Sequence, residues 1–230
     1  MTRLTIAIDG PSGSGKSTLG KRLAKALGYL YIDTGAMYRA VAWKAGQAGV
    51  ALDDEAALAR LAEAMNIQLK GSDEGVRVLV DGTDVSGEIR SPAVAQGASK
   101  VSAVPGVRRV LVRRQQEMGR AGGVVMDGRD IGTVVFPAAE IKVFLDASES
   151  ERARRRYLED VARGVASDPA ATLHEIRQRD ERDRTRKDSP LVSAADAVYI
   201  DTSGRDIESV FREIMRIVTE RQAKDVHRDR

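Results

Sequence analysis

The chain has 230 residues, which is enough to bury a substantial hydrophobic core and favours one large domain with insertions over two domains. Its 37 Lys and Arg residues nearly balance 34 Asp and Glu residues, and only 4% of its residues are aromatic, a composition that argues against a nucleic-acid-binding face. It has no cysteine, no apolar run near the length of a membrane span and no room for a signal peptide before the first predicted strand, so we expect a cytoplasmic protein without disulfides or a membrane partner.

A strand, a glycine-rich loop and a helix are predicted at the start of the chain. The apolar, β-branched run from Leu4 to Ile8 predicts a buried strand, and the leucines and alanines from residue 19 to Gly28 have helical spacing. Between them, residues 10–17 (GPSGSGKS) fit the phosphate-binding pattern GxxxxGK[ST]. Glycines let backbone N–H groups turn toward phosphate oxygens, and the helix N-terminus adds its dipole.

This loop predicts a nucleotide site. Lys16 is expected to place a point charge on the β- and γ-phosphates, and the Ser17 hydroxyl is suited to Mg²⁺. The residues expected to hold the nucleotide are Gly10, Pro11, Ser12, Gly13, Ser14, Gly15, Lys16, Ser17 and Thr18.

The chain then alternates strands and helices until a β-rich segment interrupts it. Residues 30–33 (LYID) predict a short strand that ends in a carboxylate, Thr34 is a candidate N-cap of the following helix, and Asp53 is a candidate cap of the helix after that. Short β-rich runs with Gly- and Asp-containing turns follow between residues 67 and 82 and predict a small hairpin. We interpret residues 66–100 as an insertion into the alternating chain.

Strands and helices alternate again over the second half of the chain. Helices are predicted from Pro92, from Pro105, over 149–164, over 170–187 and over 207–218, and the polar tail after Arg221 is expected to fray. A buried strand is predicted at 124–127, and further strands are predicted at 141–146 and 197–201. This alternation is typical of an α/β protein with a parallel sheet covered on both faces, in which ligands bind at the carboxyl ends of the strands.

Carboxylates and arginines follow the predicted strand ends. Asp33 and Asp127 each precede a polar, glycine-containing loop, so these carboxylates could bind Mg²⁺ beside Ser17; the alternative is that they cap helices or form ion pairs. Arginine suits bidentate phosphate recognition and the charge that develops during phosphoryl transfer. The candidate arginines near these loops are Arg39, Arg108 and Arg129.

Residues 177–186 (RQRDERDRTR) are dense in charges of both signs and have no apolar anchor. On a helix, Arg179, Asp183 and Arg186 would share one face. A solvent-exposed helix with many salt bridges is the usual meaning of such a run. The stretch also suits a lid that becomes ordered around phosphates.

Phosphoryl transfer to a small anionic acceptor explains these features better than ATP hydrolysis, because two anionic substrates would need arginines beyond the phosphate loop. Asn66 is the only Asn in the chain, so the guanine-reading NKxD motif is absent and a GTPase is disfavoured. A phosphate acceptor is already a nucleophile near pH 7, because its second pKa is about 6, and no general base is required. Kinases of UMP, dTMP or shikimate, a nucleotide-binding regulator and, more weakly, a nucleic-acid binder remain alternatives.

Six segments, in order along the chain, resemble one family. They are IAIDGPSGSGKST at 6–18, YIDTGAMYRA at 31–40, DVSGEIRSP at 84–92, DGRDIGTVVFP at 127–137, IKVFLDAS at 141–148 and RQRDERDRTR at 177–186, and together they resemble the bacterial cytidylate kinases, which are P-loop nucleoside monophosphate kinases. The resemblance implies a three-layer P-loop NTPase fold and phosphorylation of CMP and dCMP by ATP with Mg²⁺, in the cytoplasm and in a monomer. It also implies a core (1–65, 101–150 and 190–225), an acceptor-binding insertion with a small antiparallel sheet (about 66–100) and a helical lid (about 151–189).

The resemblance also assigns roles by position. Ser99, Arg108 and Asp130 would read the cytosine, whose amino group can donate to a carboxylate and whose N3 and O2 can accept from an arginine. The acceptor phosphate would lie against Thr34, Arg39, Arg129 and Arg186, the sugar would lie against Arg179 and Asp183, and the catalytic set would be Lys16, Arg129, Arg179 and Arg186. The family often has Ser in place of Thr34 and Gly in place of Ser17; either hydroxyl can donate at position 34, and Ser17 restores a direct ligand for Mg²⁺.

Overall fold

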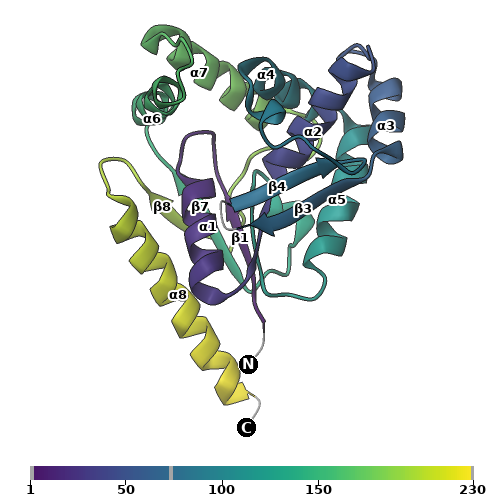
Figure 1. Ribbon diagram of the computed structural model, residues 1–230. Helices are drawn as coiled ribbons and strands as arrows, with labels where there is room; N and C mark the ends of the chain where they lie inside the picture. The colour runs from purple at the N-terminus through teal and green to yellow at the C-terminus, as the bar shows by residue number, and fades with distance from the viewer. Residues whose placement is uncertain (1–2, 73–74, 229–230) are drawn as a thin grey trace.

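A five-stranded parallel sheet lies at the centre of the computed structural model, which describes residues 3–72 and 75–228 (Figure 1). In spatial order the strands are β2 (Leu30–Asp33), β6 (Val124–Gly128), β1 (Thr5–Asp9), β7 (Ile141–Asp146) and β8 (Val198–Asp201). Every neighbouring pair in this sheet is parallel, so the carboxyl ends of all its strands meet at one edge. The predicted parallel sheet is confirmed.

Helices cover both faces of this sheet because the side chains of each strand alternate between the faces. On one face, Ile6 and Ile8 pack in a cluster with α1 (Lys16–Leu27) and α8 (Ile207–Arg228). On the other face, Ala7 packs in a cluster that includes the helical turn η2 (Ile131–Val135) and side chains of α5 (Pro105–Gly119). The predicted strands β1, β6 and β7 are therefore buried, whereas β8 lies at the edge of the sheet and exposes Val198 and Tyr199.

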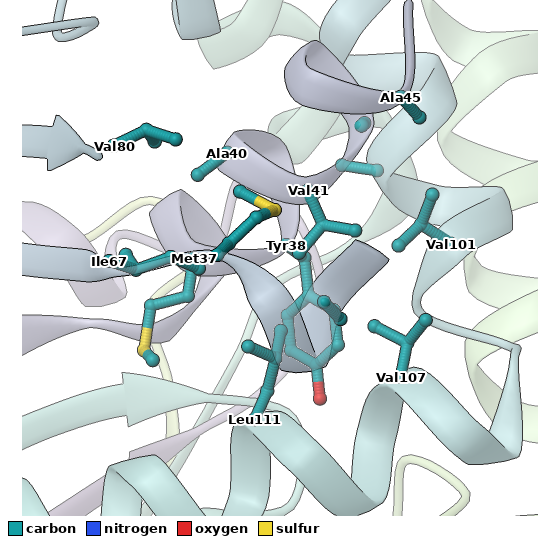
Figure 2. Packing of buried hydrophobic residues seen from close by; sticks show 14 of the residues in the cluster. Met37, Tyr38, Ala40, Val41, Ala45, Ile67, Val80, Val101, Val107 and Leu111 are labelled. Carbon is teal, nitrogen blue, oxygen red and sulfur yellow. The ribbon is translucent and has the colours of Figure 1, made fainter. Parts of the chain in front are cut away.

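A third hydrophobic cluster surrounds α2 (Thr34–Gln47) beside the sheet. Met37, Tyr38, Val41 and Ala45 are buried on this helix, and Figure 2 shows them packed with Val101, Val107 and Leu111. The cluster also includes side chains of α3 (Glu55–Ala64), α4 (Pro92–Val101) and α5. A small antiparallel sheet packs against them and consists of β3 (Ile67–Ser72), β4 (Gly75–Val80) and β5 (Thr83–Asp84). After β5 the chain continues into the short helix η1 (Glu88–Arg90). The β-rich segment predicted as an interruption thus forms its own sheet.

Two charged helices lie near the carboxyl edge of the central sheet. α6 (Glu149–Ala162) follows β7 directly, and α7 (Pro169–Thr185) packs against both α6 and α4 (Figure 1). No helix among residues 3–72 and 75–228 is long and apolar enough to cross a membrane.

Three predicted element boundaries are wrong. Asp33, not Thr34, is the N-cap of α2 and accepts from Ala36 N at 2.9 Å, because the Thr34 hydroxyl donates to the carbonyl of Asp127 instead. Asp54, not Asp53, caps α3 by accepting from Ala57 N at 2.9 Å. α8 continues to residue 228 instead of fraying after residue 221, because its last turns contain no Gly or Pro. The tip of the predicted hairpin turn at 73–74 and the chain end at 229–230 lie outside the described residues.

Candidate active site

The glycine-rich loop runs from β1 into α1 at the carboxyl edge of the sheet. Gly10, Gly13 and Gly15 have φ angles of +144°, +80° and +94°, which L side chains rarely adopt. A Cβ on Gly10 would lie 1.9 Å from the carbonyl oxygen of Leu145, so only glycine fits there. No side chain caps the N-terminus of α1 at Gly15, which leaves its first N–H groups for an anion.

Lys16 folds over this loop. Its Nζ donates to the Pro11 carbonyl at 2.5 Å and lies 3.3 Å from the Ser14 hydroxyl, and the residue is only 6% exposed. Burial, and then the nearby charge of Arg129, lower the pKa of Lys16 well below its ordinary value. A phosphate bound in the loop would place a negative charge beside the buried ammonium group of Lys16.

Two carboxylates face each other across the end of the sheet. Asp33 and Asp127 are register partners on β2 and β6. Asp127 accepts from the Ser17 hydroxyl at 2.8 Å and from the Tyr31 hydroxyl at 2.8 Å, and burial together with the charge of Asp33 raises the pKa of Asp127 to about 6. Burial alone would raise the pKa of Asp33 too, but the Arg39 guanidinium at 2.8 Å holds it below its usual value.

This oxygen-only donor set fits Mg²⁺. Because burial and the charge of Asp33 raise the pKa of Asp127, a cation bound beside this carboxylate would favour its ionised form. Among the described residues, no group of three or more His, Cys, Asp or Glu side chains could hold a metal. Mg²⁺ usually takes one or two carboxylates and completes its shell with water and phosphate oxygens, and the oxygens of Ser17, Asp33 and Asp127 are compatible with such a shell.

Arginines from separate elements converge on a cavity of about 1000 Å³ that begins at the phosphate loop. Four of them keep a buried nitrogen without a hydrogen-bond partner among the described residues: Arg39 Nε, Arg108 Nε, Arg179 Nε and Arg186 Nη2. Buried polar groups are normally paired, so these nitrogens indicate an absent acceptor ligand. Several cationic groups around one cavity favour an anion of more than one charge.

The charged helix α7 presents its predicted face to this cavity. Asp183 accepts from Arg129 Nε at 2.8 Å and lies 3.8 Å from Arg186 Nη1. Burial would raise the pKa of Asp183, but Arg129, Arg179 and Arg186 together hold it below its usual value. Burial and the Arg129 charge lower the pKa of Arg179 to about 10. The four charges form a network with more positive than negative groups.

A buried ion pair lies at the other side of the cavity. Arg108 on α5 bonds to Asp130 through Nη2 and donates to the Ser102 carbonyl through Nη1 at 3.0 Å. The guanidinium also lies over the Tyr38 ring, 5.6 Å from its centroid. The second Asp130 oxygen is 3.9 Å from Arg186 Nη2. The Asp130 carboxylate and the Arg108 guanidinium are thus held side by side, and both side chains line the cavity.

The cavity brings most of the sequence-predicted site residues together. It is lined by Ser12, Gly13, Ser14, Gly15, Lys16, Ser17, Thr18, Asp33, Thr34, Arg39, Arg108, Asp127, Arg129, Asp130, Arg179, Asp183 and Arg186. Gly10 and Pro11 form the back of the loop and do not line it, and neither does Ser99. The Ser99 hydroxyl is buried on α4 without a hydrogen-bond partner among the described residues.

Sequence reasoning missed two contributors. Tyr31 bonds to Asp127 from the middle of β2, and the strand pairing of β2 with β6 is the signal that could have placed them together. Arg152 is buried behind the phosphate loop, and nothing in its charged surroundings on α6 distinguishes it from an exposed arginine.

The parallel sheet, the phosphate loop and the arginine-lined cavity define a P-loop kinase. Solved structures of similar fold include a gluconokinase from Sinorhizobium meliloti 1021, with a TM-score of 0.50 at 18% identity over 99% of this chain and 98% of that chain. An uncharacterized protein from Eubacterium ventriosum ATCC 27560 gives a TM-score of 0.51 at 12% identity, over 94% of this chain and 99% of that one. Both likenesses concern the fold alone.

Sequence comparison identifies the family. The family model described as cytidylate kinase matches residues 6–220. The cytidylate kinase of Pelotomaculum thermopropionicum is 55% identical over 93% of this chain and 95% of its own length, and that of Geobacillus kaustophilus is 52% identical over 95% and 98%. This chain belongs to the cytidylate kinase family, as the six resembling segments predict, and is a nucleotide-binding kinase that uses ATP.

Proposed function

We propose that this enzyme transfers the γ-phosphoryl group of ATP to the phosphate of CMP or dCMP and releases ADP with CDP or dCDP. The observation that carries the proposal is the single cavity that joins the phosphate loop to the buried Arg108–Asp130 pair through a set of under-paired arginines. The loop suits the donor phosphates, the arginines suit the acceptor phosphate, and the buried pair suits a base that offers donors and acceptors on one edge.

Cytosine fits the buried pair better than uracil does. Its exocyclic amino group would donate to Asp130, and its N3 and O2 would accept from Arg108. Uracil presents a carbonyl oxygen where cytosine presents the amino group, so it would place an acceptor against the carboxylate. We also assign base reading to Ser99 on α4, whose buried hydroxyl has no hydrogen-bond partner in the part of the chain that the structure describes.

The acceptor phosphate would be held by the Thr34 hydroxyl and by Arg39, Arg129 and Arg186, and the sugar by Arg179 and Asp183. An acceptor phosphate oxygen attacks the γ-phosphorus in line while the bond to the β-phosphate oxygen breaks, so no side chain has to remove a proton from the nucleophile. Lys16, Arg129, Arg179 and Arg186 are the catalytic residues in this proposal. They neutralise the charge that spreads over the transferring group and hold it against the acceptor.

Ser17, Asp33 and Asp127 would hold Mg²⁺ beside the donor phosphates. When bound, the ion would offset the negative charge of the donor phosphates. The chain's own contribution is orientation, because Tyr31 and Ser17 each fix one oxygen of the Asp127 carboxylate. Arg39 and the start of α2 do the same for Asp33.

We further propose the predicted division into a core (1–65, 101–150 and 190–225), an acceptor-binding insertion (about 66–100) and a lid (about 151–189). We also propose that the enzyme acts as a monomer, because this proposal needs no residue from a second chain. The arginines converge on this cavity rather than on an open face, which favours small nucleotides over nucleic acid. The cytoplasm, where nucleotide pools are available, is the expected location.

The test is release of ADP from Mg·ATP in the presence of single acceptors. We expect turnover with CMP and dCMP well above turnover with UMP, AMP, GMP, dTMP or shikimate. Turnover with a different acceptor would overturn the cytosine assignment. A slow ATPase that ignores every acceptor would overturn the kinase reaction itself and favour a nucleotide-binding regulator.

A further inference from the structure

Arg152 is the largest fully buried side chain among the described residues, and it does not line the cavity. It lies in the first turn of α6 and is 1% exposed. Its Nε donates to the Ala147 carbonyl at 2.8 Å and its Nη1 to the Ser12 carbonyl at 3.2 Å. One guanidinium group therefore connects the end of β7, the phosphate loop and α6.

The phosphate loop also packs directly on the backbone of this residue. A Cβ on Gly13 would lie 2.9 Å from the Cβ of Arg152, so the loop approaches α6 as closely as a glycine permits. The position of Arg152 is thus fixed relative to the donor phosphates.

The third contact of Arg152 is an ion pair with α7, the helix that carries residues proposed to bind the acceptor. Its Nη2 lies 2.7 Å from Oδ2 of Asp180 on α7, and Asp180 is 1% exposed. Among the described residues, the Asp180 carboxylate makes no other ion pair or hydrogen bond. Asp180 directly follows Arg179 and lies one helical turn before Asp183, which are the residues proposed to meet the sugar.

We propose that the buried Arg152–Asp180 pair is a positioning device that sets the α7 face relative to the phosphate loop, so that the acceptor is presented in line with the donor. The inference rests on the proposed function and extends it to two residues that touch neither substrate. A buried ion pair adds little net stability over apolar side chains, but it tolerates little change in geometry. Transfer between two bound substrates is sensitive to misplacement of the order of 1 Å, so this geometry bears directly on the rate.

The test compares two pairs that join the same helices. Asp180→Asn removes the buried charge and leaves the bonds of Arg152 to Ala147 and Ser12 in place. Glu149→Gln is the matched control, because Arg177 and Glu149 form an ion pair between α7 and α6 whose side chains are 60% and 42% exposed. We expect Asp180→Asn to raise KM for CMP about tenfold and to lower kcat about tenfold, with KM for ATP within about threefold of wild type. Glu149→Gln should leave all three constants within about twofold.

A purely structural role would give a different result. It would lower the folded fraction, so that kcat per total enzyme falls while both KM values stay unchanged, and that outcome overturns the proposal. So does a folded Asp180→Asn enzyme whose KM for CMP lies within twofold of wild type, or a loss of the same size in Glu149→Gln.

Asp180→Asn leaves the buried Arg152 with only the more distant Asp146 carboxylate, 4.0 Å from its Nε, and can fail to fold for that reason. The double variant Arg152→Met/Asp180→Leu replaces both charges by apolar side chains of similar size and is expected to fold. It should show the same rise in KM for CMP, and wild-type CMP kinetics in this variant would overturn the proposal. Failure of the proposed function is recognised separately, because wild-type enzyme would then show no CMP-dependent release of ADP.

Discussion

The two ends of the cavity are built in different ways. The end proposed to hold the donor is the loop of residues 10–18, of which residues 12–18 line the cavity, and the proposed ligand groups there are mostly backbone N–H groups held by glycines with positive φ. The acceptor end is assembled from α2, α5, the loop after β6 and α7, and it works through side chains such as Arg39, Arg108 and Arg186. The first depends on local chain geometry, and the second depends on long-range packing.

This difference predicts how each end responds to substitution. A backbone site is insensitive to most side-chain changes but depends strongly on its one charged side chain and on glycine. A side-chain site loses specificity in steps, since each arginine or carboxylate serves one part of the ligand. Substitutions at the two ends should therefore separate donor binding from acceptor binding.

The largest effect is expected at the donor end. Lys16→Ala removes the ammonium group of the phosphate loop, and we expect kcat to fall about 10³-fold, because charge on the transferring group is no longer neutralised in a buried site. The protein should fold as well as wild type, since removal of a buried, under-stabilised charge does not weaken the core. Steady-state kinetics and circular dichroism measure the two quantities. Lys25→Ala, an exposed lysine on the same helix, serves as control. Retained turnover in Lys16→Ala would mean that the loop does not hold the donor.

The next effect is expected at the acceptor end. Asp130→Ala removes one charge-assisted hydrogen bond to the base, which is worth about 1.5–3 kcal/mol, so kcat/KM for CMP should fall about 10- to 100-fold. KM for ATP should change little, because the proposed role of Asp130 is to contact the acceptor base and not the donor phosphates. The ratio of kcat/KM for CMP to that for UMP is the decisive measurement. If this ratio stays at the wild-type value, Asp130 does not read the base.

The same contrast explains what could be predicted from the sequence. The strand, the loop and α1 are contiguous, so their pattern predicts both their structure and their ligand. The capping of α2 illustrates the opposite case. Both Asp33 and Thr34 can cap a helix, and the choice depends on the Asp127 carbonyl, which accepts from Thr34 across 93 positions of the chain.

Residues that act through burial were not predictable in the same way. Arg108 and Asp130 are assigned to the base by family resemblance, and no spacing rule joins a residue of α5 to one 22 positions further on. Arg152 is harder still, because a charged helix normally exposes its arginines. Its burial depends on Asp180, which reaches it from the neighbouring helix α7.

A smaller effect is expected at Tyr31, which lies where the donor and acceptor ends of the cavity meet. Tyr31→Phe removes the hydroxyl that orients Asp127, and we expect the half-saturating concentration of Mg²⁺ to rise about tenfold. Burial and the charge of Asp127 raise the pKa of Tyr31 well above its ordinary value, so the hydroxyl remains a donor throughout the working pH range. Tyr29→Phe, which loses a hydroxyl at the opposite end of the strand, is the matched control. An equal Mg²⁺ requirement in both variants would remove Asp127 from the metal site.

The smallest effect concerns stability without nucleotide or Mg²⁺. The unfolded chain loses the Asp127 proton near the ordinary pKa of 3.8, whereas the folded protein keeps it until about pH 6, so this group lowers the free energy of unfolding as pH rises through that window. Asp127→Asn abolishes the titration but weakens the bonds to Ser17 and Tyr31. We therefore expect a net gain of about 1 kcal/mol, or roughly 2–4 °C in Tm, above pH 6.

The gain should turn into a net loss below about pH 4, where wild-type Asp127 is protonated in both states and only the weakened bonds to Ser17 and Tyr31 distinguish the two proteins. Thermal unfolding in EDTA from pH 4 to 8 measures the difference between the two proteins. Asp9 also titrates near pH 6, but it is present in both proteins and cancels. A difference that does not change with pH would show that Asp127 carries no unbalanced charge. A gain at pH 7 together with lost Mg²⁺-dependent turnover would show that the carboxylate pair is kept for the reaction at the expense of stability.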